Sequence, residues 1–326
     1  MAPANAPAVA LDHIVLLVSP HFLSNLPAWI TAAFTILPGG QHADGVTENK
    51  LIIFSDGTYI EMIAFVHDVD PAKRAAHRWG ACTEGEIVDW ALTLLSPAQA
   101  SPPAPEEYFP TIQAHVRAAQ QKPESFTYLN PSAGGRITPE GTEVRWAVAA
   151  PKEVYVKSQG YYGRELGFLD ITGGELPFWC LDRTPRELRV PYQQRKEVTE
   201  HPSLVMGVAG VELFVKGEQR VEKLRRVYHA VLGGDSKRPD DGGAVSPASE
   251  WTLPVPATVS AAGDGSLLVL EELRKSNERV PKDNTRSVHV SISLFTTGSP
   301  KTLTGETGDG RFLSLRLIPA TNTIPN

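Results

Sequence analysis

The chain of 326 residues is long enough for about two domains, and its 41% hydrophobic and 21% charged residues are typical of a globular protein. Its formal net charge of −6 argues against a non-specific nucleic-acid-binding protein, which needs a basic excess. The two cysteines, Cys82 and Cys180, lie in no C-x-x-C motif. They predict free thiols in a reducing compartment and argue against a disulfide framework or a zinc ribbon.

The first ten residues, MAPANAPAVA, contain no basic segment and no long apolar segment, so we expect no signal peptide. We expect residues 1–10 to form a disordered tail. No uncharged apolar run in the chain approaches the ~20 residues that a membrane helix requires. The sequence therefore predicts a soluble, cytoplasmic protein with no membrane partner.

The first 66 residues predict one β-α-β-β-β unit. The apolar run LDHIVLLV (11–18) is typical of a strand that is buried on both faces. Apolar residues at helical spacing predict a helix over 21–34, with Pro27 near a first turn. The runs KLIIF (50–54) and TYIEMIAFV (58–66) flank Ser55-Asp56-Gly57, and an Asp-Gly step between two apolar runs predicts a hairpin.

The same order of elements is expected twice more. A strand at 86–95 and a helix at 106–121 precede strands within 126–130, 134–150 and 175–183. A third unit begins with a strand at 207–215 and a helix at 218–234; its further strands are expected at 251–256, 266–272, 287–295 and 312–318. We therefore predict an α+β fold of tandem β-α-β-β-β modules that form a curled, barrel-like mixed sheet. Residues 11–195 would form the paired-module domain, and residues 200–320 a degenerate third module.

Glu61 is the most informative residue of the first unit. Because side chains alternate along a strand, it shares a face with Tyr59, Ile63 and Phe65. An enclosed carboxylate requires a metal, a cation, a retained proton or a hydrogen-bond network to offset its burial. The alternative is a glutamate at a strand end that contacts water.

His13 is equally unusual inside the apolar run 11–18. Most buried strand histidines only form hydrogen bonds with their neighbours, and that alternative stays open. His13 is near the start of the first strand of the unit and Glu61 is in its last strand. If these strands are neighbours, an imidazole and a carboxylate converge inside one concave sheet.

Three segments resemble the glyoxalase-like domain proteins of the vicinal oxygen chelate superfamily: LDHIVLLV, PGGQHADGVTENKLIIFSDGTYIEMIAF and ELPFWCLDRTPRELRVP. The segments GGRITPEGTEVRWAVAA and HPSLVMGVAGVEL extend the resemblance over about residues 11–215. It implies paired modules around a cleft in which a divalent metal (Mn, Fe, Ni, Zn or Mg) binds substrate oxygens in the metal-dependent relatives. The ligands of those relatives come from the first and fourth strands, and His13 and Glu61 match two such positions.

The second unit departs from that pattern. Alignment of its first strand places Asp89 at the position of His13, which makes Asp89 a candidate third metal ligand. In its last strand, Phe178 or Trp179 stands where a second glutamate is expected. Without a metal, histidine and carboxylate groups also suit a general base and the groups that orient it.

Other candidates lie near this pair in the predicted fold. His42 is in a loop, where functional residues often concentrate, and Asn49 begins a strand; both are candidate substrate ligands. Arg136 follows two glycines and suits a carboxylate or a polarised carbonyl. Trp146 and Trp179 are expected to form an aromatic wall for a flat ligand, or else to pack in the core. The basic run RTPRELRVPYQQRK is expected to be a solvated face.

The leading functional hypothesis is an enzyme that abstracts a proton next to a carbonyl of a small oxygenated molecule, with an isomerase, lyase or cyclase outcome. Glu61 or His13 would act as the base, while a metal or Arg136 would stabilise the oxyanion. The alternative is a non-catalytic small-molecule binding protein of the same fold. No G-x-G-x-x-G, phosphate loop or G-x-S-x-G motif is present. Apolar edge strands would allow a homodimer.

Overall fold

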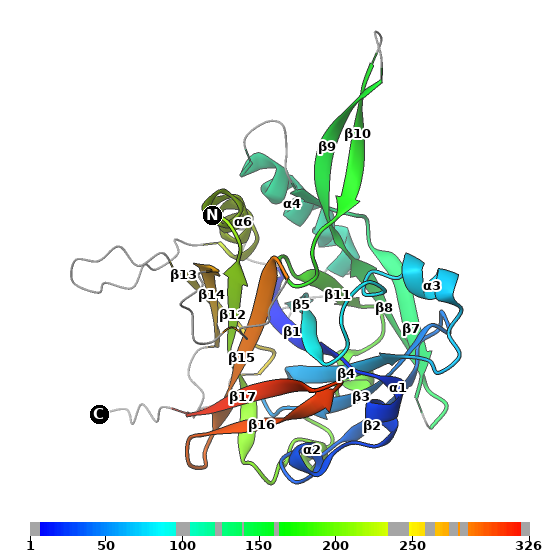
Figure 1. Cartoon of the computed structure of the whole chain (residues 1–326), viewed down its shortest axis with the longest axis vertical. Coiled ribbons are helices and arrows are strands. Elements are labelled where there is room, and N and C mark those ends of the chain that lie inside the picture. Colours follow the sequence, from blue (N-terminus) through cyan, green and yellow to red (C-terminus); the bar gives the residue numbers. More distant parts are fainter. Residues whose placement is uncertain are drawn as a thin grey trace, which may run out of the picture.

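The computed structural model describes residues 7–95, 105–120, 126–138, 140–159, 163–233, 248–257, 265–273, 280 and 286–320. Two large mixed sheets dominate it, one on each side of the view in Figure 1, with the longest helices at one end. The expected α+β class with tandem modules is confirmed. Of the expected disordered tail, residues 1–6 lie outside the described residues, whereas residues 8–10 already belong to the first strand.

The first sheet has eight strands in the order β2-β3-β4-β1-β5-β11-β8-β7. Its first four sequential strands form the first module, and its last four form the second. The strands are β1 (Ala8–Leu17), β2 (Leu37–Gln41), β3 (Thr47–Ile53), β4 (Tyr59–Phe65), β5 (Glu86–Leu95), β7 (Ser132–Ile137), β8 (Glu143–Ala149) and β11 (Phe178–Asp182). The predicted strands at 11–18, 50–54, 58–66 and 86–95 are thus present with small differences at their ends.

The two modules meet at their first strands. β1 runs antiparallel to β5, and each of them pairs in parallel with the last strand of its own module. In the first module Val15 lies opposite Glu61, and in the second Ala91 lies opposite Phe178.

The C-terminal part forms a second sheet of six strands, in the order β13-β14-β12-β15-β17-β16. Its strands are β12 (Val205–Val215), β13 (Ser249–Leu253), β14 (Ser266–Glu272), β15 (Val288–Thr296), β16 (Lys301–Gly308) and β17 (Arg311–Pro319). β12 pairs in parallel with β14 and antiparallel with β15, which in turn pairs in parallel with β17. This order is a shortened form of the order in the first sheet. The expected third module contributes β12, β13 and β14, and a further unit contributes β15, β16 and β17. β16 was not expected from the sequence.

A smaller sheet has the order β10-β9-β6, built from β6 (Phe126–Tyr128), β9 (Pro151–Gln159) and β10 (Gly163–Asp170). Its β9–β10 hairpin extends away from the rest of the molecule at the top of Figure 1. The sequence analysis did not anticipate this hairpin within the second module.

Helices pack around the sheets, and two short ones, at 71–76 and 186–189, contribute Ala76 and Arg189 to the wall of the cavity described below. They are α1 (Pro20–Ser24), α2 (Ala28–Thr31), α3 (Pro71–Ala76), α4 (Pro105–Ala118), α5 (Arg186–Arg189), α6 (Glu218–Leu232) and the 3₁₀ helix η2 (Lys196–Val198). α6, which was expected at 218–234, buries Leu224, Val227, Tyr228 and Val231, and Gly233 caps its C-terminus. The helix expected over 21–34 is instead two short helices, because Pro27 cannot donate the backbone hydrogen bond that a continuous helix needs. None of the helices in the described part of the chain is long and apolar enough to span a bilayer.

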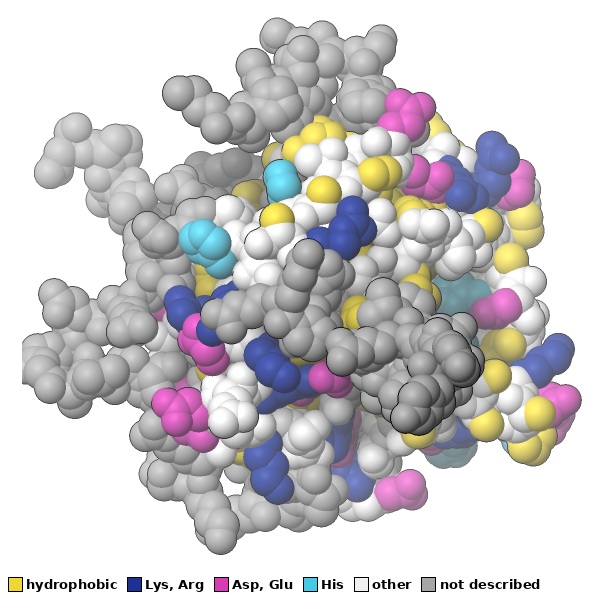
Figure 2. Space-filling model, turned by 90° about the horizontal axis from the view of Figure 1, so that it is seen from above, with side chains coloured by type: hydrophobic (Ala, Val, Ile, Leu, Met, Phe, Trp, Pro, Cys, Tyr) yellow, Lys and Arg dark blue, Asp and Glu magenta, His cyan; other side chains and the backbone are white. Residues whose placement is uncertain are grey.

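Figure 2 shows one face of the molecule, on which Lys and Arg side chains lie among Asp and Glu side chains. In this view the described residues form no continuous basic stripe.

The turn between β3 and β4 joins the two large sheets through Asp56. This side chain is 1% exposed, and its Oδ1 accepts hydrogen bonds from the backbone N–H and the hydroxyl of Thr58 at 2.8 and 2.7 Å. Gly207 of β12 faces it so closely that a Cβ there would lie 2.0 Å from Oδ2. Burial raises the pKa of Asp56 to about 7, although the bonds from Thr58 oppose that shift.

We expect Asp56 to make the protein less stable as the pH rises from about 4 to 7. The folded protein keeps a proton on Asp56 that the unfolded chain releases above its pKa of 3.8. The contribution of Asp56 to the free energy of unfolding is therefore fully present below pH 3.8 and is lost as the pH rises through the folded pKa near 7. The shift is worth about 4 kcal/mol at most. Urea unfolding of the wild type and of Asp56→Asn across this range measures it, since only the wild type should show the decline. His201, whose pKa burial lowers to about 4, is common to both proteins and cancels in the difference. Parallel stability curves would contradict the prediction.

Candidate functional site

A cavity of about 460 Å³ lies on the inner face of the eight-stranded sheet. Both modules contribute to its wall, so it spans the junction at which β1 and β5 meet. A volume of this size is within the range of small-molecule binding sites. The residues of the wall used below are His13, His42, Asn49, Tyr59, Glu61, Arg78, Trp79, Leu129, Gly134, Arg136, Trp146, Val148, Phe178, Cys180 and Arg189.

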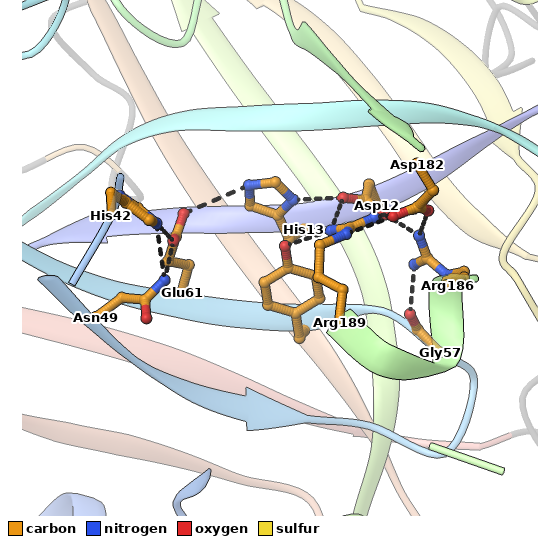
Figure 3. Close-up of polar contacts among 10 residues, drawn as sticks. Asp12, His13, His42, Asn49, Gly57, Glu61, Asp182, Arg186 and Arg189 are labelled. Carbon is orange, nitrogen blue, oxygen red and sulfur yellow. Dashed lines mark hydrogen bonds and ion pairs between the residues drawn. The ribbon is translucent and has the colours of Figure 1, made fainter. Parts of the chain in front are cut away.

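Glu61 lies on this wall between two histidines (Figure 3). Its Oε2 is 3.5 Å from Nε2 of His13, and its Oε1 is 3.6 Å from Nε2 of His42. The side-chain amide of Asn49 donates a hydrogen bond to Oε1 at 2.5 Å. The two strands that the sequence placed in one unit thus bring His13 and Glu61 into a common hollow, as predicted.

His13 is held by a carboxylate on its other side. Its Nδ1 is 2.7 Å from Oδ2 of Asp12, which assigns a proton to Nδ1 and leaves Nε2 directed at Glu61. The ring stacks on Tyr59 with the centroids 4.6 Å apart, and Phe178 meets it edge-on. These contacts fix the plane of the imidazole.

Asp12 in turn binds two arginines from the segment after β11. Arg189 donates to both of its oxygens, at 2.8 and 3.1 Å, and Arg186 donates to Oδ1. Burial alone would raise the pKa of Asp12, but the two guanidinium groups and the bond from His13 outweigh it and hold the pKa well below its usual value. Asp12 is therefore a fixed negative charge behind His13.

A β-bulge explains how two successive residues of one strand can be partners. Leu11 pairs with Leu92 and His13 with Ala91, so Asp12 is the extra residue on β1. Neighbouring side chains normally point to opposite faces of a sheet, and a bulge interrupts that alternation. β12 has an equivalent bulge at Ala209, next to Gly210, so the second large sheet repeats the geometry without the Asp-His pair.

The other predicted site residues divide into two groups. His42, Asn49, Arg136 and Trp146 all line the cavity. Nδ1 of His42 is 2.7 Å from the hydroxyl of Thr47, and the ring packs edge-on against Trp146. Gly134 gives the indole of Trp146 its space, because a Cβ there would lie 2.6 Å from Nε1.

Trp179 and Asp89 do not line the cavity. Trp179 is fully buried on the opposite face of β11, where it packs against Phe109 and Tyr128. The alternation along β11 instead directs Phe178 and Cys180 into the hollow. This corrects the expected pairing of Trp146 with Trp179.

Asp89 binds Arg78 and Trp79, at 2.5 and 2.9 Å, and these two residues line the cavity. The expected alignment of Asp89 with His13 fits the strand registers. Val15, two residues after His13, lies opposite Glu61, and Ala91, two residues after Asp89, lies opposite Phe178.

The sequence analysis missed Asp12, Arg186 and Arg189. The basic run that contains the two arginines was expected to be solvated, yet the Arg189 side chain is 4% exposed and the Arg186 side chain 13% exposed. The one local signal was an Asp-His dipeptide inside an apolar strand, which places two polar groups side by side where one would have been unusual.

One group of possible metal ligands in this cavity does not suit a divalent ion well. In the described part of the chain, Asp12, His13 and Cys180 are the group whose ligand atoms lie within 4.8 Å of one another. The oxygens of Asp12 already accept bonds from two guanidinium groups, and burial raises the pKa of the Cys180 thiol well above its usual value. A protonated thiol and a carboxylate shared with two cations are poor ligands for a divalent ion.

Residues 11–229 match the model of the family described as glyoxalase-like domain. The chain belongs to the glyoxalase-like domain family. This confirms the resemblance drawn from the segments in the first two modules, and the match extends into α6. No curated protein matches this chain.

Two solved structures resemble this glyoxalase-like protein. A hypothetical protein from Staphylococcus aureus matches with a TM-score of 0.57 and 13% identity, over 95% of this chain and 99% of the other. A xylose isomerase-like TIM barrel/4-hydroxyphenylpyruvate dioxygenase fusion protein matches with a TM-score of 0.38 and 14% identity, over 90% of this chain and 37% of the other. The similarity to the Staphylococcus aureus protein extends over nearly the whole of both chains and concerns the fold alone.

Proposed function

We propose that this glyoxalase-like protein is an enzyme that removes a proton from the carbon next to a carbonyl group of a small oxygenated molecule bound in the cavity. The observation that carries the proposal is the state of Glu61. Its carboxylate is oriented by Asn49 and flanked by two imidazoles, and no Lys or Arg lies within ion-pair distance of it in the described part of the chain. Asp12, Asp89 and Asp182, in contrast, all bind arginine.

A general base must be positioned and must be able to accept a proton. In the proposed step an oxygen of Glu61 accepts the proton, and the electron pair of the broken carbon–hydrogen bond moves to the carbonyl oxygen as an enolate. The guanidinium of Arg136 would stabilise that negative charge. Return of the proton to a neighbouring atom gives an isomerase, and loss of a leaving group gives a lyase or a cyclase.

His13 would also restore the base. Its Nε2 is 3.5 Å from Glu61, so a small movement allows a proton to pass between the two groups. The fixed charge of Asp12 would stabilise the imidazolium that forms. The chain from Asp12 through His13 to Glu61, drawn in Figure 3, is therefore suited to repeated proton transfer.

A non-catalytic binding protein is the second candidate. The last strand of the second module, β11, contributes Phe178 and Cys180 to the cavity wall, and neither side chain supplies a second carboxylate or imidazole, which favours this candidate.

Nuclear magnetic resonance in D₂O separates the two candidates. A panel of small carbonyl compounds is incubated with the wild-type protein, and deuterium entry at the carbon next to the carbonyl is followed. An enzyme accelerates this exchange for at least one compound over the buffer rate. A compound that binds, shifting its resonances, without faster exchange would support the binding protein and contradict the proposed reaction.

A further inference from the structure

Arg136 differs from the other arginines of the cavity in having no anionic partner. Its side chain donates one hydrogen bond, from Nη1 to the carbonyl oxygen of Gly39 at 2.9 Å. Arg78 is paired with Asp89, and Arg189 with Asp12 and Asp182. Within the described ranges no carboxylate lies within 4 Å of Arg136, although the residue is only 5% exposed.

A buried cation without a counter-charge is costly, and a guanidinium has five N–H donors to satisfy. Burial lowers the pKa of Arg136, and the negative charge of Glu61 acts against that shift without forming an ion pair. Because Arg136 is part of the cavity wall, an anion in the cavity can reach its remaining donors. A carboxylate suits this geometry, since it accepts two parallel bonds from one guanidinium.

The rest of the wall is largely apolar. Trp79, Trp146 and Phe178 contribute aromatic surface, and Leu129 and Val148 contribute aliphatic surface. A ligand that consisted only of a small anion would leave this surface and most of the 460 Å³ in contact with water. The wall therefore fits an anionic group attached to an apolar body.

We propose that the cavity binds a monocarboxylate with an apolar body, whose carboxylate is held by Arg136 and whose body lies against Trp146 and Phe178. That the bound acid is also the substrate rests on the proposed function. In that case the carboxylate directs the adjacent carbonyl carbon and its neighbour toward Glu61.

Acid–amide pairs test the binding directly, without turnover. Isothermal titration of the full chain with 3-phenylpropionate and 3-phenylpropionamide, and with hexanoate and hexanamide, compares ligands that differ only in the charged group. The wild type should bind at least one acid about tenfold or more tightly than its amide, as expected for a charge-assisted pair of hydrogen bonds. Arg136→Gln should abolish that preference by weakening acid binding alone, and Arg136→Lys should retain part of it.

Two further variants separate this proposal from the proposed reaction. Glu61→Gln should keep the preference for the acid, because it removes a base and not the carboxylate ligand. Arg195→Gln, a change at an exposed arginine outside the cavity wall, should leave both affinities unchanged. Equal affinity of the wild type for both members of each pair, or no binding of either acid, would overturn the proposal even if Arg136→Gln failed to fold. Loss of deuterium exchange in Glu61→Gln concerns the proposed reaction and not the binding of the carboxylate by Arg136.

Discussion

Replacement of Glu61 by glutamine is expected to slow deuterium exchange of the substrate by about 10²–10⁴-fold, the usual contribution of a general base. Glutamine has nearly the shape of glutamate and can still accept the hydrogen bond from Asn49. It has no basic oxygen, so it cannot take the proton from carbon. Ligand affinity should therefore change far less than the rate.

The measurement compares exchange rates in D₂O at saturating substrate, so that weaker binding does not imitate slower chemistry. Glu48→Gln is a matched control, since Glu48 lies on the adjacent strand β3 and is not part of the cavity wall. It should retain the wild-type rate. Exchange in Glu61→Gln within a few-fold of the wild type would show that another group is the base.

Replacement of Asp12 by asparagine is expected to lower the free energy of unfolding by about 3–5 kcal/mol, the usual cost of removing one partner from a buried ion pair. Asp12 is fully buried, and its charge balances Arg186 and Arg189, whose side chains are 13% and 4% exposed. Asp182 would remain as a counter-charge, but it is shared between the same two arginines. The variant leaves excess positive charge in a region that water barely reaches.

Urea unfolding at pH 7 measures this difference. Asp68→Asn is the matched control, because Asp68 contacts the preceding His67 at 3.0 Å just as Asp12 contacts His13, yet both side chains are almost fully exposed. Its stability should stay within about 0.5 kcal/mol of the wild type. The folded pKa of Asp12 is depressed, so its contribution is present above its unfolded pKa of 3.8 and is lost as the pH falls toward the folded value. An equal, small effect in both variants would contradict the role assigned to Asp12.

The sequence by itself determined the elements and the first module. β1 and β4 are apolar runs that contain His13 and Glu61, and the two-residue period of a strand indicates which side chains share a face with each of them. That period made His13 and Glu61 stand out as polar residues in apolar strands. The prediction that they share a hollow also required the two strands to be neighbours, as the resemblance to the glyoxalase-like domain proteins implied.

Only the tertiary structure decided the partners of these residues. Arg186 and Arg189 lie 174 and 177 positions from Asp12, and a run of charged residues gives no sign of which side chains will be buried. The bulge at Asp12 shifts the side chains of β1 by one position. A difference of one residue places a side chain on the other face of a sheet, which is why Trp179 lies in the core while Phe178 and Cys180 line the cavity. Strand pairing and register follow from contacts between distant segments, and those contacts are formed only when the whole chain folds.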